Sequence, residues 1–171
     1  EVAAEAGVPV RPSAAIIAAA QDRKLEKQAL EAAGVAVAPW CPAATLEEFA
    51  DAVAELGIPV IAKAARFGYD GKGQLRIDDL AQIEAAWETL EHQRLVVESV
   101  IVFERELSVV VARGVDGTMI DHGVMENEHV NHILDLTVVP AEVSDLTMAA
   151  ARQIAHDTAI ALDLVGVLCV E

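Results

Sequence analysis

Apolar and polar positions along the chain change period several times, which separates predicted helices from predicted strands. Apolar side chains near helical spacing occur in four stretches. Each stretch begins at a serine, threonine or aspartate that can cap the first turn of a helix. The pattern predicts helices at residues 13–34, 45–57, 79–92 and 144–164.

Short apolar runs between these stretches predict strands. Asp116-Gly117 separates two of the runs and is a strong turn signal, so those two runs should pair as a hairpin. Helices and strands are mixed, with hairpins in the second half, which favours an α+β fold over an alternating doubly wound sheet. The expected strands lie at residues 35–40, 58–65, 74–77, 94–101, 105–114, 118–127, 132–140 and 165–171.

Charge and composition then exclude several classes of protein. The 171 residues include 12 Lys and Arg against 28 Asp and Glu, a net charge of −16, which argues against nucleic-acid binding. Two distant cysteines form no disulfide framework, and no apolar run approaches the roughly 20 residues of a membrane span. A cytoplasmic protein without a membrane partner is expected.

A glycine-rich loop breaks this acidic background. Four of the twelve basic residues lie between Lys63 and Arg76, around the segment GYDGKGQ. Backbone N–H groups of such a loop can bind a phosphate. The loop is no Walker A motif, because Lys72 precedes Gly73 rather than Ser or Thr, and no dinucleotide fingerprint, because it joins two strands. On spacing alone, an ordinary glycine hairpin remains an alternative.

Charged residues inside apolar runs are the other candidates. Lys63 lies in VIAKAA, where an unpaired ammonium would be costly unless strand alternation turns it to solvent. Glu98 and Glu106 lie in a similar apolar context, where a ligand site or a solvated strand edge would both fit. Glu171 ends an apolar run, a common place for a metal-binding carboxylate. The pair His129 and His132 lacks a third ligand for zinc.

Taken together, five segments resemble a known family. They are AQDRKLEKQALEAAGVAVAPW, PVIAKAARFGYDGKGQ, VVESVIVFERELSVVVAR, MENEHVNHILDLTVVPA and ALDLVGVLCVE. In this order they are similar to the N5-carboxyaminoimidazole ribonucleotide synthases, ATP-grasp ligases that form the ATPase subunit of phosphoribosylaminoimidazole carboxylase. The resemblance implies that ATP and bicarbonate carboxylate 5-aminoimidazole ribonucleotide in purine synthesis. It also implies Mg²⁺, with Mn²⁺ as the alternative ion, and a homodimer at full length.

The resemblance also implies a domain plan. Residues 1–12 would be the tail of an otherwise missing N-terminal Rossmann-like domain, and residues 13–171 an ATP-grasp domain, so that the fold is truncated at both ends. Two α+β subdomains would grip ATP, one at about 43–101 carrying a lid and one at about 102–171 that begins the metal-binding part. The 171 residues alone are then expected to fold poorly or bind ATP weakly, and not to turn over.

Site residues follow from the same resemblance. Phe67 departs from a glycine common in the family, and Ala65 from a basic residue. Another ATP-grasp carboxylase or ligase, or a non-catalytic nucleotide-binding module, stays open as an alternative. The implied roles are phosphate binding by Arg23 and Lys63; a lid formed by Gly68, Tyr69, Asp70, Gly71, Lys72, Gly73 and Gln74; catalysis by Lys63, Tyr69 and Asp70, the last two facing the ribonucleotide; an adenine hinge at Glu98, Ser99, Val100 and Ile101; ribose binding by Glu106; nucleotide contact by His129; and Mg²⁺ binding by Glu171.

Overall fold

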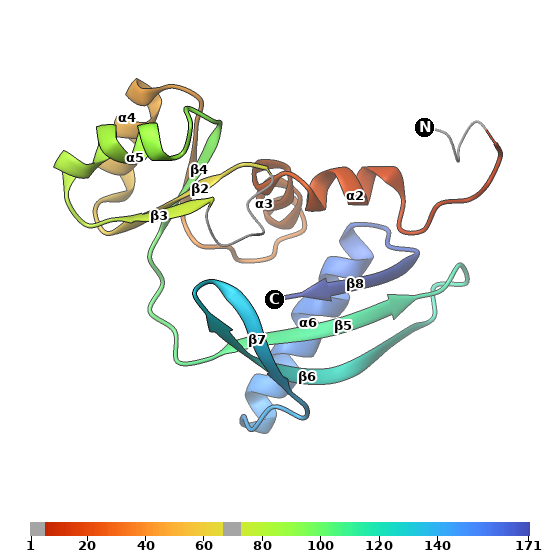
Figure 1. Cartoon of the computed structure of the whole chain (residues 1–171). Helices are drawn as coiled ribbons and strands as arrows, with labels where there is room; N and C mark the ends of the chain where they lie inside the picture. Colours follow the sequence, from red (N-terminus) through yellow and green to blue (C-terminus); the bar gives the residue numbers. More distant parts are fainter. Residues whose placement is uncertain (1–5, 67–72) are drawn as a thin grey trace.

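Two antiparallel four-stranded sheets organise the chain in a computed structural model that describes residues 6–66 and 73–171 (Figure 1). The first sheet has the order β1-β4-β2-β3 and the second the order β7-β6-β5-β8. The strands are β1 (Trp40–Ala43), β2 (Val60–Ala64), β3 (Gln74–Ile77), β4 (Leu95–Ser99), β5 (Glu106–Arg113), β6 (Met119–Val130), β7 (Ile133–Val138) and β8 (Gly166–Val170). The helices are α2 (Ala14–Ala20), α3 (Arg23–Ala32), α4 (Leu46–Leu56), α5 (Ile83–Thr89) and α6 (Asp145–Ala161), with a 3-10 turn at Leu80–Gln82.

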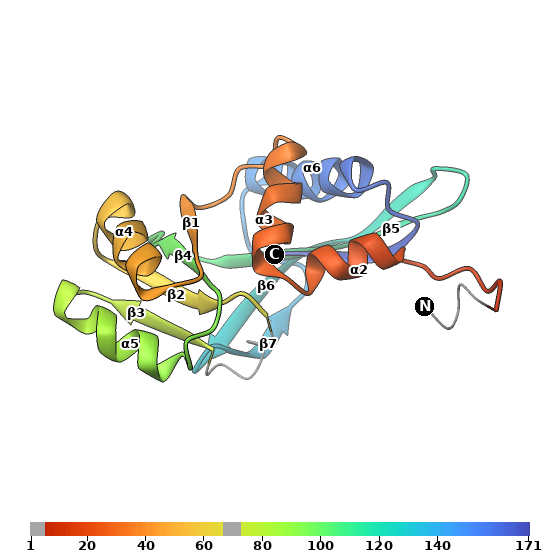
Figure 2. The same cartoon turned by 90° about the horizontal axis from the view of Figure 1, so that it is seen from above.

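The first sheet is covered on one face by α4 and α5. Phe49 of α4 and Trp87 of α5 pack together over the sheet, with ring centroids 6.3 Å apart. Strand β2 alternates, so Val60, Ala62 and Ala64 point into this core and the residues between them point to the opposite face. That opposite face is the side on which α3 lies (Figure 2).

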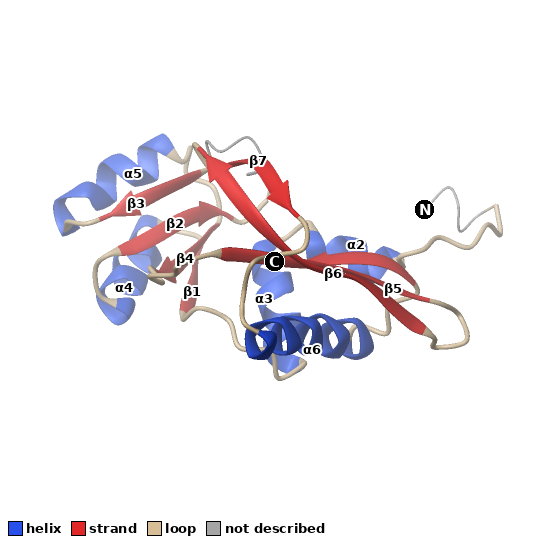
Figure 3. Cartoon of the chain, turned by 90° about the horizontal axis from the view of Figure 1, so that it is seen from below, coloured by secondary structure: helices blue, strands red, loops and turns tan. Residues whose placement is uncertain are grey.

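The second sheet is covered on one face by α6 (Figure 3). Val109 and Val111 of β5 and Val124 of β6 are buried with Ala155 and Ala159 of α6. An irregularity in the β5–β6 register lies where Gly123 adopts φ +81°, and it brings residue 121 onto the same face as residue 124. The opposite face carries the polar residues of β5 and β6 that concern the site.

Three predicted elements differ from those observed. The stretch 13–34 is two helices and not one, because Asp22 ends the first and caps the second through the N–H groups of Lys24 and Leu25. The first strand is Trp40–Ala43 rather than 35–40, because only those residues pair with β4. The helix expected at 79–92 begins as a 3-10 turn and ends at Thr89. Among the helices of residues 6–66 and 73–171, none is long and apolar enough to span a bilayer.

A buried carboxylate joins α6 to β6. Asp121, whose side chain is 3% exposed, accepts hydrogen bonds from both Arg152 and His156 at 2.9–3.0 Å and from the Gly123 N–H at 3.0 Å. Burial alone would raise the pKa of Asp121, but the hydrogen bonds from Arg152, Gly123 and His156 and the Arg152 charge outweigh it and hold that pKa below its ordinary value.

Asp121→Asn should therefore lower the free energy of unfolding by about 1–3 kcal/mol at pH 7, because Arg152 and His156 lose a charged acceptor. The contribution of Asp121 is present above its unfolded pKa and is lost as pH falls below about 4, through its folded pKa. Urea unfolding should show the stabilities of wild type and variant converging as pH falls below about 4 and through the lowered folded pKa of Asp121. Asp135→Asn, at an exposed position on β7, is the control; a constant difference across pH would contradict the assignment.

Candidate functional site

Lys63 lies near the end of β2, shortly before the glycine-rich segment in the sequence. Strands β2 and β3 pair so that Lys63 lies directly opposite Gln74, and the Ala64 N–H donates to the Gly73 carbonyl at 2.8 Å. Lys63 and Gln74 therefore lie at the ends of β2 and β3 that are joined by residues 65–73. The predicted lid residues between them, Gly68, Tyr69, Asp70, Gly71 and Lys72, lie outside the described residues.

Glu98 of β4 is the partner of Lys63. Ile61 lies opposite Glu98 across β2 and β4, which makes Lys63 a diagonal neighbour of Glu98 on the face away from the core. The Lys63 ammonium donates to Glu98 Oε2 at 2.9 Å, and the two side chains are 22% and 11% exposed. Strand alternation thus turns Lys63 away from the core but into an ion pair, not into open solvent.

Helix α3 adds two cations to the same place. The Arg23 side chain donates through Nε to the Ala64 carbonyl at 3.2 Å, and its backbone N–H donates to the Ala65 carbonyl at 2.9 Å. One helical turn later, the Lys27 ammonium lies 3.4 Å from Glu98 Oε1. Sequence reasoning missed Lys27; its spacing of four residues from Arg23 was the signal that could have found it.

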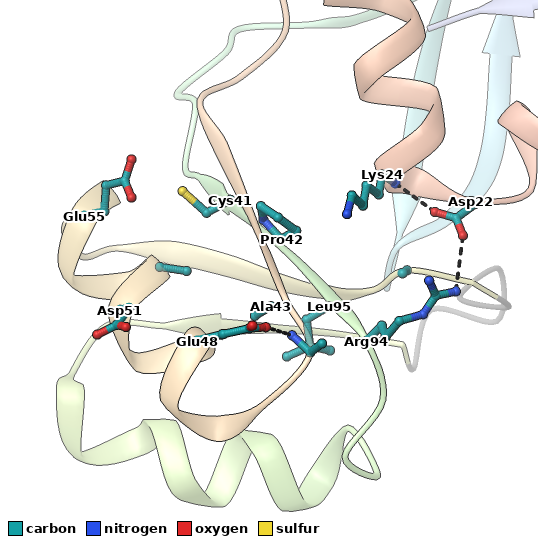
Figure 4. Close-up of a pocket in the computed structure, with 13 residues that line it drawn as sticks. Asp22, Lys24, Cys41, Pro42, Ala43, Glu48, Asp51, Glu55, Arg94 and Leu95 are labelled. Carbon is teal, nitrogen blue, oxygen red and sulfur yellow. Dashed lines mark hydrogen bonds and ion pairs between the residues drawn. The ribbon is translucent and has the colours of Figure 1, made fainter.

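Asp22 fastens the start of α3 to the first sheet. Its side chain is 7% exposed and lies 3.4 Å from an Arg94 nitrogen and 3.8 Å from an Arg66 nitrogen, besides capping α3 (Figure 4). Arg66 lies two residues after the end of β2, and Arg94 is the residue immediately before β4. Asp22 therefore holds three chain segments together beside Arg23 and Lys63.

The segment that leaves β4 was the predicted adenine hinge. The N–H groups of Ser99 and Val100 donate to the carbonyls of Pro39 and Pro59 at 2.9 and 3.4 Å. Within the part of the chain that the structure describes, the Ile101 N–H donates to no protein group, and this residue is 52% exposed. One backbone donor of the hinge is therefore available to a ligand.

Glu106 and His129 come together on the open face of the second sheet. Glu106 lies opposite Asn127 across β5 and β6, and His129 Nδ1 lies 2.9 Å from Glu106 Oε2. Asn127 is buried and accepts a hydrogen bond from the Thr137 hydroxyl at 3.0 Å. The two predicted nucleotide-contacting side chains thus bind each other directly.

A cavity of about 710 Å³ brings several of these residues together. Its wall is formed by α3, residues 35–38 and α6, together with the ends of β2, β4 and β8 and the part of β5 beyond its last pairing with β8. Glu106 itself does not line this cavity, although its neighbours Arg105 and Leu107 do. The polar residues on its wall are Arg23, Glu26, Lys27, Lys63, Glu98, Arg105, Ser108, Thr147 and Glu171.

Glu171 follows β8 at one end of this wall. The pairing of Val109 with Val170 implies that Glu171 is next to Ser108, on the face of the sheet that also carries Glu106. Among residues 6–66 and 73–171, no group of three His, Cys, Asp or Glu side chains could hold a metal ion. Glu171 alone suits an ion such as Mg²⁺ that takes most of its oxygen ligands from phosphates and water.

A second cavity, of about 630 Å³, lies on the other side of the start of α3. Its wall includes Glu48, Asp51 and Glu55 on one side and Lys24 and Arg94 on the other (Figure 4). None of the residues predicted for the site lines it, and its four carboxylates, Asp22 included, outnumber its two cations and would repel a phosphate. The cavity that contains Lys63 is therefore the stronger candidate for binding an anionic nucleotide.

A family model of the ATP-grasp domain matches residues 28–171, so the chain belongs to the ATP-grasp family. The N5-carboxyaminoimidazole ribonucleotide synthase of Bacillus subtilis is 43% identical over 151 residues, which cover 88% of this chain. These residues are 40% of that relative, so the chain spans less than half the length of this protein.

Solved structures agree with this family. The N5-carboxyaminoimidazole synthase of Aspergillus clavatus, in complex with ADP and 5-aminoimidazole ribonucleotide, matches with a TM-score of 0.87 and 27% identity over 98% of this chain and 43% of its own. A biotin carboxylase from Campylobacter jejuni reaches a TM-score of 0.89 at 24% identity over 98% of this chain and 40% of its own. The latter shares the fold alone, so the fold by itself does not distinguish the substrate.

Asp22→Ala should lower the free energy of unfolding by about 1–3 kcal/mol, because α3 loses its cap and Arg94 loses an acceptor. Asp22→Asn keeps a capping oxygen and should cost less. Urea denaturation of both variants measures the difference. If Asp22→Ala left stability unchanged, Asp22 would not be the link between α3 and the first sheet.

Proposed function

We propose that this chain forms the nucleotide-binding core of a ligase that carboxylates 5-aminoimidazole ribonucleotide. ATP and bicarbonate would be consumed, and N5-carboxyaminoimidazole ribonucleotide, ADP and phosphate would be formed, as a step of purine synthesis. The observation that carries the proposal is that Arg23, Lys63 and Glu98 line one cavity, at the end of β2 that the glycine-rich segment follows in the sequence. The 43% identity to a synthase of this name supports the choice of substrate.

Two of the cations, Lys63 and Arg23, would bind the phosphates of ATP. Lys63 and Arg23 lie at the end of β2, where they would place two positive charges against the phosphates of ATP. The Ile101 N–H would donate to the adenine ring, and Glu106, oriented by His129, would accept from the ribose hydroxyls. Charge-assisted hydrogen bonds of this kind are the stronger ones in proteins, which suits a triphosphate in an otherwise acidic chain.

The proposed chemistry has two steps. Bicarbonate oxygen attacks the terminal phosphorus of ATP, which gives carboxyphosphate and ADP. The amine of the ribonucleotide then attacks the carboxyl carbon, the bond from that carbon to the phosphate oxygen breaks, and the amine loses a proton. Lys63 would stabilise the charge on the transferring phosphoryl group, which is the main demand of such a reaction.

The remaining roles belong to the same proposal. Tyr69 and Asp70 would face the ribonucleotide, and Gly68–Lys72 with Gly73 and Gln74 would close over the phosphates and exclude water from carboxyphosphate. Glu171 would hold Mg²⁺, or Mn²⁺, which would supply positive charge to neutralise the phosphates. Residues 43–101 and 102–171 would act as the two gripping subdomains of a cytoplasmic homodimer.

A different ATP-grasp ligase is the second candidate, because the biotin carboxylase shares the fold so closely. Substrate dependence separates the two. The protein in its natural length should hydrolyse ATP only when bicarbonate and 5-aminoimidazole ribonucleotide are both present, measured as phosphate release. Hydrolysis that ignores the ribonucleotide would refute the proposed substrate and leave the ATP-grasp fold intact.

Lys63→Ala should raise the KM for ATP and lower kcat together, with a loss of about 10²–10³ in kcat/KM, because ground state and transition state both lose a phosphate contact. Steady-state kinetics at varied ATP measures both constants. Lys24→Ala is the matched control, since Lys24 lies on α3 and lines the other cavity. Unchanged kinetics for Lys63→Ala would remove Lys63 from the site.

A further inference from the structure

Lys27 shares one carboxylate with Lys63. Glu98 Oε1 lies 3.4 Å from the Lys27 ammonium, and Glu98 Oε2 accepts from the Lys63 ammonium at 2.9 Å. The Lys27 and Glu98 side chains are only 12% and 11% exposed. Two cations from different elements, α3 and β2, therefore neutralise a single carboxylate that has little contact with water.

The surroundings make an unpaired charge costly at this place. Glu26, also on α3 and on the wall of the same cavity, has its pKa raised by burial, against the lowering influence of Arg23 and Lys27. Removing one partner from a buried ion pair is strongly destabilising, because the other charge stays buried without compensation. Glu98 would be such an unpaired buried charge if no ammonium lay beside it.

Nucleotide binding creates this problem if Lys63 is the only partner of Glu98. A lysine on a flexible stem can turn from Glu98 to a phosphate, but the carboxylate would then lose its closer neighbour. Lys27 is on a different element and contacts the other carboxylate oxygen, so it can remain in place when Lys63 moves. The carboxylate keeps one positive neighbour throughout.

We propose that Lys27 is a positioning residue that keeps Glu98 neutralised and fixed at the start of the hinge while Lys63 engages the nucleotide phosphates. The inference rests on the proposed function, because it requires that Lys63 binds phosphate. Lys27 acts through Glu98 and makes no contact of its own with the nucleotide. Its effect on binding should therefore disappear when the charge of Glu98 is removed.

A double-mutant cycle in the natural-length protein tests this dependence. The dissociation constant for ADP is measured by calorimetry for wild type, Lys27→Met, Glu98→Gln and the double variant. Lys27→Met should weaken ADP binding about 5- to 30-fold in the wild-type background and less than about 3-fold in the Glu98→Gln background. Lys27→Arg should bring affinity back to within about 3-fold of wild type, since it restores the charge.

The controls separate positioning from simple support of the fold. Lys24→Met, on the same helix but beside the other cavity, should leave ADP affinity unchanged. If Lys27 only fastened α3, Lys27→Met would lower the unfolding temperature and weaken ADP binding equally in both backgrounds, which would overturn the inference. ADP affinity untouched by Lys27→Met would also overturn it. A wild-type protein that binds no ADP would overturn the proposed function, and this inference with it.

Discussion

The carboxylate of Glu98 is the point on which the arrangement of the site depends. It is nearly buried, and it binds an ammonium from β2 and another from α3. A buried ion cluster is weak evidence for stability, because the cost of removing charges from water offsets their attraction. The position of this ion cluster between α3 and the first sheet is better explained by what the cations do when a phosphate binds.

Each sheet can contribute polar residues to the site because helices cover only one of its two faces. Helices α4 and α5 cover the apolar face of the first sheet, and α6 covers that of the second. The uncovered faces carry Lys63 and Glu98 on one sheet, and Glu106, Ser108 and Asn127 on the other. Antiparallel sheets tolerate such a polar face, and here α3 lies against it and adds Arg23 and Lys27.

Net charge gives this site its contrast with the rest of the surface. A chain with a charge of −16 repels anions in general, so a triphosphate needs a local excess of cations that carboxylates do not cancel completely. Four cations, Arg23, Lys27, Lys63 and Arg105, line one cavity beside three carboxylates, whereas the cavity on the other side of α3 has four carboxylates and two cations. This difference in the charge of the lining residues makes the cavity with Lys63 the one that suits a nucleotide.

The sequence alone determined what depends on neighbouring residues. The caps at Ser13, Thr45 and Ser144 and the turn at Asp116-Gly117 were predictable, because each interaction closes within about four residues. The cap at Asp22 is equally local, since it closes on Lys24 and Leu25. Tertiary structure decided the ion pair of Asp22 with Arg94, 72 residues away, and the pairing of Lys63 with Glu98 across 35 residues. The apolar residues around Lys63 mark it as unusual in the sequence. Only the packing of distant segments decides that Glu98 neutralises it, because no helical or strand period relates residues 35 positions apart.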